Sequence, residues 1–348
     1  MNDTCILASI IIPVYNTAPY IEECLDSIFV CQKIKHTIEV IVVNDASTDG
    51  SLDILNEYRE RHDFILITQE SSGAGGARNT GINAAQGKYL LFVDSDDYLE
   101  PGSLDTLLDH LAVSDDDIVQ YEYKVYNEAG RDFSHNMRPP VVQCGKGQDV
   151  FAVWKKNGFY RPMVWITAVS REMVVSNKLY FYQGILNEDE EWSPKIYAYA
   201  DSVRYLPLVV YVYRTRENSC STNKSPKNYM DLLKCIDSLM EFSDCHDFSK
   251  EYIRAMQRNF AFLYFSIIKN IKFDGNYNYD LISELEKRRD IMKFLDDFHR
   301  RFFYKYIIDT LGIKNFYILK YGYKDSLHYS APNKCDMENM TGLNTIIK

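Results

Sequence analysis

The sequence predicts an α/β protein whose mostly parallel sheet is covered by helices on both faces, followed by a helical C-terminal region. In the first 126 residues, short β-branched runs alternate with segments whose apolar residues recur at helical spacing. The short runs are apolar almost throughout, which is typical of parallel strands that are buried on both faces. Beyond residue 225 only the helical spacing is found.

The expected elements follow one another in a regular order. Strands are expected at residues 9–15, 38–43, 64–68 and 89–93, and helices at 20–30, 52–58, 78–85 and after Pro101. The middle of the chain is mixed, with tyrosine-rich strands expected at 119–126 and 206–213 and a helix at 150–156. We therefore expect one α/β domain over residues 1–222 and a helical region over residues 223–348.

Composition limits the classes of function. The 348 residues carry 49 acidic and 39 basic side chains, a net charge of −10, which argues against a nucleic-acid binder because phosphate contact needs a basic face. Pro13 interrupts the N-terminal apolar run, and no apolar stretch approaches the roughly 18 residues that span a bilayer. The eight cysteines form no CxxC pair, so we expect reduced, mostly buried thiols and a cytoplasmic protein.

Three carboxylates follow the strand expected at residues 89–93. Asp94, Asp96 and Asp97 come directly after five apolar residues, and crowded anions need a cation or a set of donors to neutralise them. A D-x-D at a strand end suits Mg²⁺ or Mn²⁺, which take one or two carboxylates and complete their shells with substrate phosphate and water. An Asp-rich turn that caps the helix after Pro101 is the alternative.

Asp45 ends the second expected strand. A carboxylate there is placed to accept a hydrogen bond from a ribose hydroxyl or a base N–H, because ligands bind outside the carboxyl ends of parallel strands. Alternatively, residues 45–49 build an Asx-type turn and cap the helix that follows.

A glycine-rich stretch at residues 71–77 matches neither a dinucleotide fingerprint nor a P-loop. We expect a flexible loop that delivers Arg78 and Asn79 toward the carboxylates, where a guanidinium is suited to a diphosphate.

A second acidic run spans residues 187–191 and is followed by Trp192. Such a run is usually a solvated helix start, since anions complement the helix dipole. The flanking apolar residues leave open that one carboxylate faces a cleft and works as a general base.

Together these motifs resemble a family 2 glycosyltransferase. The segments that carry the resemblance are SIIIPVYN (9–16), VIVVNDASTDGS (40–51), GARNTG (76–81), GKYLLFVDSDDYLEP (87–101) and NEDEEW (187–192). The resemblance implies the GT-A fold, a Rossmann-like nucleotide-binding α/β/α sandwich with a mostly parallel sheet, here with a C-terminal α-helical extension. It also implies a nucleotide-sugar-binding half at residues 1–115 and an acceptor-binding half at residues 116–222.

The resemblance assigns roles by position. The nucleotide-binding residues that it implies are Pro13, Tyr15, Asn16, Asp45, Arg78, Asp94, Ser95, Arg214 and Arg216. Asp45 would contact the base, and Asp96 would bind Mn²⁺ or Mg²⁺, with Asp94 nearer the ribose and the second candidate ligand. Arg214 and Arg216 belong to a Y-R-x-R-x-x-S stretch that either closes over the diphosphate or forms a basic surface turn.

Asp189 is the catalytic base that the resemblance implies, with Glu188 and Glu190 as alternatives. The implied reaction is an inverting, metal-dependent transfer of a sugar from a nucleotide-diphosphate donor, expected to be a UDP-sugar, to a saccharide or lipid-linked glycan in cell-surface polysaccharide biosynthesis. A sugar nucleotidyltransferase and a non-catalytic binding subunit with the same fold are the alternatives.

Residues 298–324 hold six basic side chains and one acidic side chain, interleaved with aromatic residues. Such a segment suits peripheral contact with the anionic inner face of the cytoplasmic membrane. A pair of helices that covers the catalytic domain is the alternative.

Overall fold

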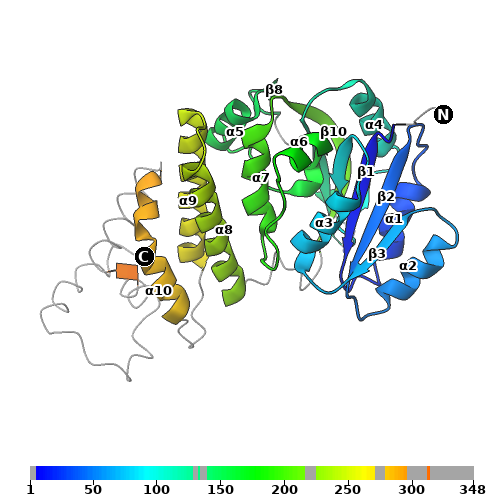
Figure 1. The fold of residues 1–348 in the computed structure, drawn as a ribbon, viewed down its shortest axis with the longest axis horizontal. Coiled ribbons are helices and arrows are strands. Elements are labelled where there is room, and N and C mark those ends of the chain that lie inside the picture. The colour runs from blue at the N-terminus through cyan, green and yellow to red at the C-terminus, as the bar shows by residue number, and fades with distance from the viewer. Residues whose placement is uncertain are drawn as a thin grey trace, which may run out of the picture. The chain divides into compact units, whose positions relative to one another are not determined.

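The computed structural model describes residues 5–127, 132–133, 139–215, 225–270, 279–295 and 312–313. One mixed sheet with the order β3-β2-β1-β4-β9-β6-β10-β5 runs through it, with β7 paired to β6 and β8 paired to β10. Figure 1 shows β3, β2 and β1 side by side. Its strands are β1 (Ala8–Val14), β2 (Ile38–Asp45), β3 (Ile65–Gln69), β4 (Tyr89–Phe92), β5 (Tyr98–Leu99), β6 (Ile118–Asn127), β7 (Asp132–Phe133), β8 (Cys144–Gly145), β9 (Thr167–Ser170) and β10 (Val203–Thr215).

The long strands of the sheet run in one direction. β1 pairs in parallel with β2 and β4, β2 with β3, and β6 with β10. β9 is antiparallel to both β4 and β6, so β6 and β10 point the same way as β4. The carboxyl ends of these parallel strands therefore open on one edge of the sheet, as the predicted mostly parallel architecture requires.

Helices cover both faces of the sheet (Figure 1). The helices of the described residues are α1 (Ile21–Phe29), α2 (Ser51–Arg59), α3 (Gly73–Ala84), α4 (Ser103–Val113), α5 (Gly147–Lys156), α6 (Arg171–Ser176), α7 (Glu188–Tyr199), α8 (Pro226–Asp244), α9 (Lys250–Asn270) and α10 (Tyr279–Lys287), with 3₁₀ turns at η1 (Val164–Ile166) and η2 (Arg289–Phe294). The strands and helices expected from the sequence are present, with bounds that shift by a few residues.

The two faces of β1 pack against different helices. Ile10 and Ile12 belong to one buried cluster with residues of α1, α2 and α4. Ile11 faces the other way, toward α3, where a Cβ on Gly81 would lie 2.3 Å from Ile11 Cγ2. The glycines of residues 73–81 therefore let a helix lie close to the sheet. The expected flexible loop is wrong, because the helix already begins at Gly73.

The chain divides into two compact units, Met1–Asn259 and Phe260–Lys348. All of α8 and part of α9 belong to the first unit, whereas a boundary at residue 222 was expected; the functional division at that residue stays a prediction. The basic segment 298–324 lies outside the described residues, apart from residues 312–313.

The structure bears on two expectations: the absence of membrane-spanning segments and the burial of the cysteines. Within the described part of the chain, none of the helices combines the length and apolarity that crossing a bilayer requires. The expectation of mostly buried thiols is wrong for the described cysteines, because Cys5, Cys31, Cys144 and Cys245 are exposed and only Cys24 and Cys235 are buried.

Candidate active site

Arg78 joins two acidic segments that are 94 residues apart in the sequence. It lies in α3 and is 4% exposed. Its Nη2 donates to Asp94 Oδ1 at 2.6 Å, and its Nη1 donates to Glu188 Oε1. Asp94 follows β4 and Glu188 opens α7, so one guanidinium holds the end of a strand and the start of a helix together. The expected approach of Arg78 to the carboxylates is observed.

The glycines of α3 make this approach sterically feasible. A Cβ on Gly75 would lie 2.9 Å from the Tyr182 carbonyl oxygen and 3.3 Å from Glu188 Cγ, so a larger residue would push the segment before α7 away. Asn79 fastens the same segment, since its Nδ2 donates to the Phe181 carbonyl at 2.9 Å and its Oδ1 accepts from the Phe181 N–H at 2.8 Å. Asn79 was expected to face the carboxylates and instead positions the chain that carries Glu188.

Asp97 braces the acidic turn that follows β4. It is 2% exposed, and its carboxylate accepts from the Tyr211 hydroxyl and the Arg214 N–H, both at 2.7 Å. The Tyr211 hydroxyl also accepts from the Asp94 N–H at 3.1 Å. Burial, with Asp96 and Asp94 nearby, raises the pKa of Asp97 well above its ordinary value. The sequence analysis did not identify the role of Tyr211, because the pattern of β10 predicts only that it is a strand residue.

Asp94 and Asp96 are the carboxylates of this turn that stay partly exposed. The Asp94 side chain is 27% exposed, and one of its oxygens accepts from Arg78. Among the residues that the structure describes, no group of three or more His, Cys, Asp or Glu side chains is arranged to hold a metal ion. Mg²⁺ and Mn²⁺ need only one or two protein carboxylates when substrate phosphates complete the shell, so the pair fits such an ion.

Asp45 is bonded within the protein. Its carboxylate is 3% exposed and accepts from the backbone N–H groups of Ser72 at 2.8 Å and Gly73 at 2.9 Å. It also accepts from Gln69 Nε2 at 2.8 Å and from the Ser71 hydroxyl at 3.1 Å. Asp45 thereby caps the start of α3, and its contact with a nucleotide base stays a prediction.

The start of α2 is capped by a different acid. Asp49 accepts from the Ser51 N–H at 3.1 Å and from the Ser51 hydroxyl at 2.6 Å, and its other oxygen accepts from the Ala18 N–H at 2.9 Å. Of the alternative in which residues 45–49 cap the helix after β2, the part that concerns Asp49 is observed, whereas Asp45 bonds the start of α3.

The residues that follow β1 form the neighbouring part of the same sheet edge. Tyr15 is 56% exposed. Asn16 has a φ of +53°, and its Oδ1 accepts from the Thr48 N–H at 2.8 Å. Ser95 accepts from the Thr17 hydroxyl at 3.0 Å. Pro13 is buried within β1, so only Tyr15 and Asn16 of the three expected pocket residues present surface at this edge.

The carboxylates at the start of α7 differ in their partners. Glu188 is 8% exposed and is ion-paired with Arg78. Glu191 is 1% exposed and accepts from Lys195 and from the Ser238 hydroxyl. Asp189 accepts from the backbone N–H of Glu190 at 2.9 Å. Glu188 and Glu191 are thus engaged by basic side chains, and the choice of Asp189 over the alternative Glu190 stays a prediction.

The surroundings of Asp189 favour its protonated form. Burial and the neighbouring charges of Glu188 and Glu190 raise its pKa well above the ordinary value, and Arg78 opposes part of this increase. Only the ionised carboxylate can take a proton, so this increase sets the pH range in which Asp189 could act as a base.

Arg214 lies at the end of β10 on the other side of the acidic turn. Its Nε donates to the Asp96 carbonyl at 3.1 Å, and its Nη2 donates to Glu23 at 2.6 Å. The guanidinium also lies over the rings of Tyr20 and Tyr98. Arg214 therefore supports the turn in this structure, and its contact with a diphosphate stays a prediction. Arg216 lies outside the described residues.

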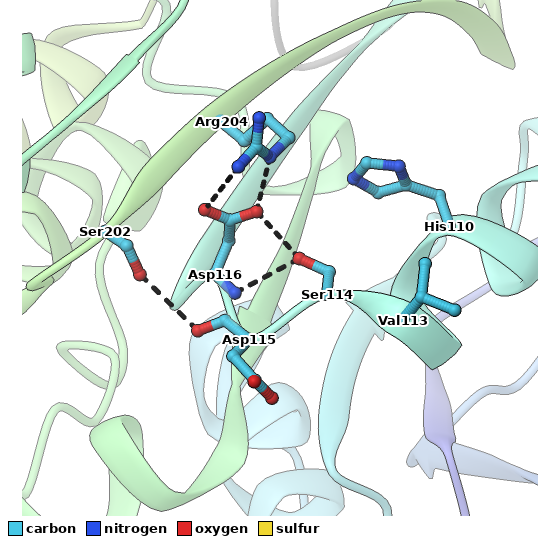
Figure 2. A pocket seen from close by; sticks show the side chains of 7 residues that line it. All are labelled: His110, Val113, Ser114, Asp115, Asp116, Ser202 and Arg204. Carbon is cyan, nitrogen blue, oxygen red and sulfur yellow. Dashed lines mark hydrogen bonds and ion pairs between the residues drawn. The ribbon is translucent and has the colours of Figure 1, made fainter.

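A hollow of about 380 Å³ lies at the opposite edge of the sheet, where β6 and β10 begin (Figure 2). Its lining residues are His110, Val113, Ser114, Asp115, Asp116, Ser202 and Arg204. Figure 2 shows Arg204 paired with Asp116, whose carboxylate also accepts from the Ser114 hydroxyl at 2.7 Å. None of the predicted site residues lines it, so the carboxyl edge remains the candidate active site.

Comparisons with known proteins identify related sequences and structures. The model of the family described as glycosyl transferase family 2 matches residues 9–183. The glycosyltransferase GlyA of Streptococcus pneumoniae is 34% identical over 61% of this chain and 31% of that protein. A poly(ribitol-phosphate) beta-glucosyltransferase of Bacillus spizizenii is 31% identical over 76% of this chain and 41% of that protein. The chain thus spans less than half the length of these two relatives.

Solved structures show the same fold. The crystal structure of S. aureus TarS 1–349 in complex with UDP-GlcNAc has a TM-score of 0.68 and 20% identity, and the match covers 89% of each chain. The predicted GT-A fold is confirmed. The family match ends at residue 183, before the acidic run that opens α7.

Replacing Arg78 with alanine should destabilise the fold by about 3 kcal/mol, because removing one partner of a buried ion pair leaves the other charges uncompensated. Urea unfolding of the variant measures this loss. Arg61→Ala is the matched control, since Arg61 pairs with Glu22 at 3.4 Å while both side chains are more than half exposed. The control should lose no more than about 1 kcal/mol. Equal losses in the two variants would contradict the bridging role of Arg78.

Proposed function

Because the chain belongs to glycosyl transferase family 2, we propose that it transfers a sugar from a nucleoside-diphosphate donor to a hydroxyl group of a saccharide or a lipid-linked glycan. The proposal places this transfer in the assembly of a bacterial cell-surface polysaccharide. It includes inversion at the anomeric carbon, which a single displacement with one protein base produces.

One observation carries the proposal: Arg78 brings the Asp94 turn and the Asp189 segment to the same edge of the sheet. Displacement at a sugar carbon needs a site for the diphosphate and a base on the acceptor side. The turn at residues 94–97 supplies candidate groups for the first, and Asp189 supplies the second.

The proposed step is a direct displacement. The acceptor oxygen bonds to C1 of the donor sugar as its proton passes to the Asp189 carboxylate. The bond between C1 and the diphosphate oxygen breaks, and that oxygen leaves with the electron pair. Product release carries away the nucleoside diphosphate. Glu188 does not compete for the proton, because its charge is engaged by Arg78.

Asp96, together with Asp94, would hold a divalent cation in this proposal. Bound there, Mn²⁺ or Mg²⁺ would offset the negative charge that builds on the departing diphosphate. Arg78 keeps Asp94 oriented through the 2.6 Å hydrogen bond to its Oδ1, which leaves Oδ2 for other partners.

We further propose a UDP-sugar as the donor. Support comes from the fold shared with TarS, whose structure holds UDP-GlcNAc. For an acceptor that offers hydroxyl groups, support comes from a relative with 31% identity that is named for glucosyl transfer to poly(ribitol-phosphate). Peripheral membrane contact through residues 298–324 would bring a lipid-linked acceptor within reach.

Asp189→Asn should retain donor binding and lose at least about a hundredfold in kcat, because the amide cannot accept the acceptor proton. Release of free nucleoside diphosphate from UDP-sugars, with acceptor present, measures turnover. Asp96→Ala is the contrasting variant and should lose the Mn²⁺-dependent part of nucleotide binding measured by calorimetry. Normal turnover by Asp189→Asn would show that the base is a different residue.

The kcat of the wild-type enzyme should increase with pH across the raised pKa of Asp189, because only the ionised carboxylate takes the proton. Glu190→Gln removes a neighbouring negative charge that raises this pKa. The acid limb of the profile should therefore move to lower pH in that variant. A profile that stays flat through the acid range in both proteins would argue against a carboxylate base.

A further inference from the structure

Helix α8 contacts both sides of the residues that include the proposed base. Asp231 Oδ2 accepts from the Leu186 N–H at 3.1 Å, and the Cys235 thiol donates to the Asn187 carbonyl at 3.4 Å. The Ser238 hydroxyl donates to Glu191 Oε1 at 2.6 Å. The spacing of four and three residues puts the three α8 side chains on one face of the helix.

The segment that α8 contacts contains a residue with a left-handed backbone conformation. Asn187 has a φ of +63°, in the left-handed region, directly before α7 begins at Glu188. Asparagine enters this region more readily than most residues, and the contacts around it select this conformation from the alternatives. The hydrogen bonds from α8 to Leu186 and Asn187 provide such contacts, two residues before Asp189.

Asp231 is a buried acceptor whose charge is compensated on its own helix. Its side chain is 1% exposed, with Lys234 Nζ at 2.8 Å and Lys227 Nζ at 3.3 Å. Burial opposes its ionisation, but hydrogen bonds from Lys234 and the Leu186 N–H outweigh burial and lower the pKa of Asp231. The Leu186 amide thus donates to a carboxylate that is ionised at neutral pH, which gives a stronger bond than a neutral acceptor.

We propose that Asp231 is a positioning residue that fixes the direction of the Asp189 carboxylate through the turn at residues 186–187. This inference rests on the proposed function, since it assigns Asp231 to the base of that reaction. It also places α8, beyond the expected domain boundary at residue 222, within the catalytic machinery. Asp231 acts through the backbone and contacts neither substrate nor reacting atoms.

Hydrogen exchange of the full chain tests the backbone part of the proposal without any assay of activity. Asp231→Ala should speed exchange of the Leu186 amide by about tenfold or more, because its charged acceptor is lost. Asp231→Asn keeps an oxygen acceptor and should show a smaller increase. Glu241→Ala, at an exposed acid of the same helix, is the matched control and should leave the rate unchanged.

Steady-state kinetics test the catalytic part. Asp231→Ala should lower kcat about ten- to a hundredfold, since misplacing a catalytic group by an ångström has an effect of this size. The Kd for UDP should stay within about twofold of the wild-type value, whereas a general loss of structure would weaken both. Asp231→Asn should recover most of the lost kcat.

Two results would overturn the proposal: an unchanged Leu186 exchange rate in Asp231→Ala, or an unchanged kcat in that variant while the wild type is active. Parallel losses of kcat and UDP affinity, with no recovery in Asp231→Asn, would also overturn it, in favour of a purely structural role. Failure of the proposed function gives a distinguishable result. The wild type then releases no nucleoside diphosphate from any donor, while the exchange rate of the Leu186 amide still shows whether Asp231 holds the turn.

Discussion

The buried ion pairs of Arg78 are the interaction on which the candidate site depends. One guanidinium, 4% exposed, holds Asp94 at the end of β4 and Glu188 at the start of α7. A shorter side chain at this position would not contact both carboxylates, and a neutral one would leave their charges uncompensated. Two glycines of α3 allow the close approach that this bridge needs: Gly81 packs against Ile11 of the sheet, and Gly75 packs against the chain before α7.

The same arrangement distributes negative charge unequally among neighbouring acids. Asp97 is buried among donors that brace the turn, Asp94 and Glu188 share Arg78, and Asp189 receives only a backbone N–H among the hydrogen bonds described for it. Burial and neighbouring carboxylates then raise the pKa of Asp189. The raised pKa of Asp189 thus follows from its burial beside other acids, of which Arg78 offsets only part.

Much of the fold was predictable because local signals decide it. Apolar runs and helical spacing located the strands and most helices. The rule that ligands bind at the carboxyl ends of parallel strands correctly predicted that Arg78, which follows β3, lies near the acidic turn after β4. The start of α3 was missed because glycines disfavour helices locally, and tertiary packing against Ile11 overrides this preference. The hydrogen bond between Gln69 and Asp45 joins residues 24 positions apart, and the one between Leu186 and Asp231 joins residues 45 positions apart. No local sequence pattern predicts such contacts.

A double-mutant cycle between Asp94→Asn and Glu188→Gln, followed by urea unfolding, tests most directly whether one arginine couples the two acidic segments. If both carboxylates depend on Arg78, the two losses of unfolding free energy should be non-additive, with a coupling of about 0.5–3 kcal/mol. The same cycle between Asp94→Asn and Glu22→Gln should be additive, because Glu22 pairs with Arg61. Additivity within about 0.5 kcal/mol for Asp94 and Glu188 would contradict the account.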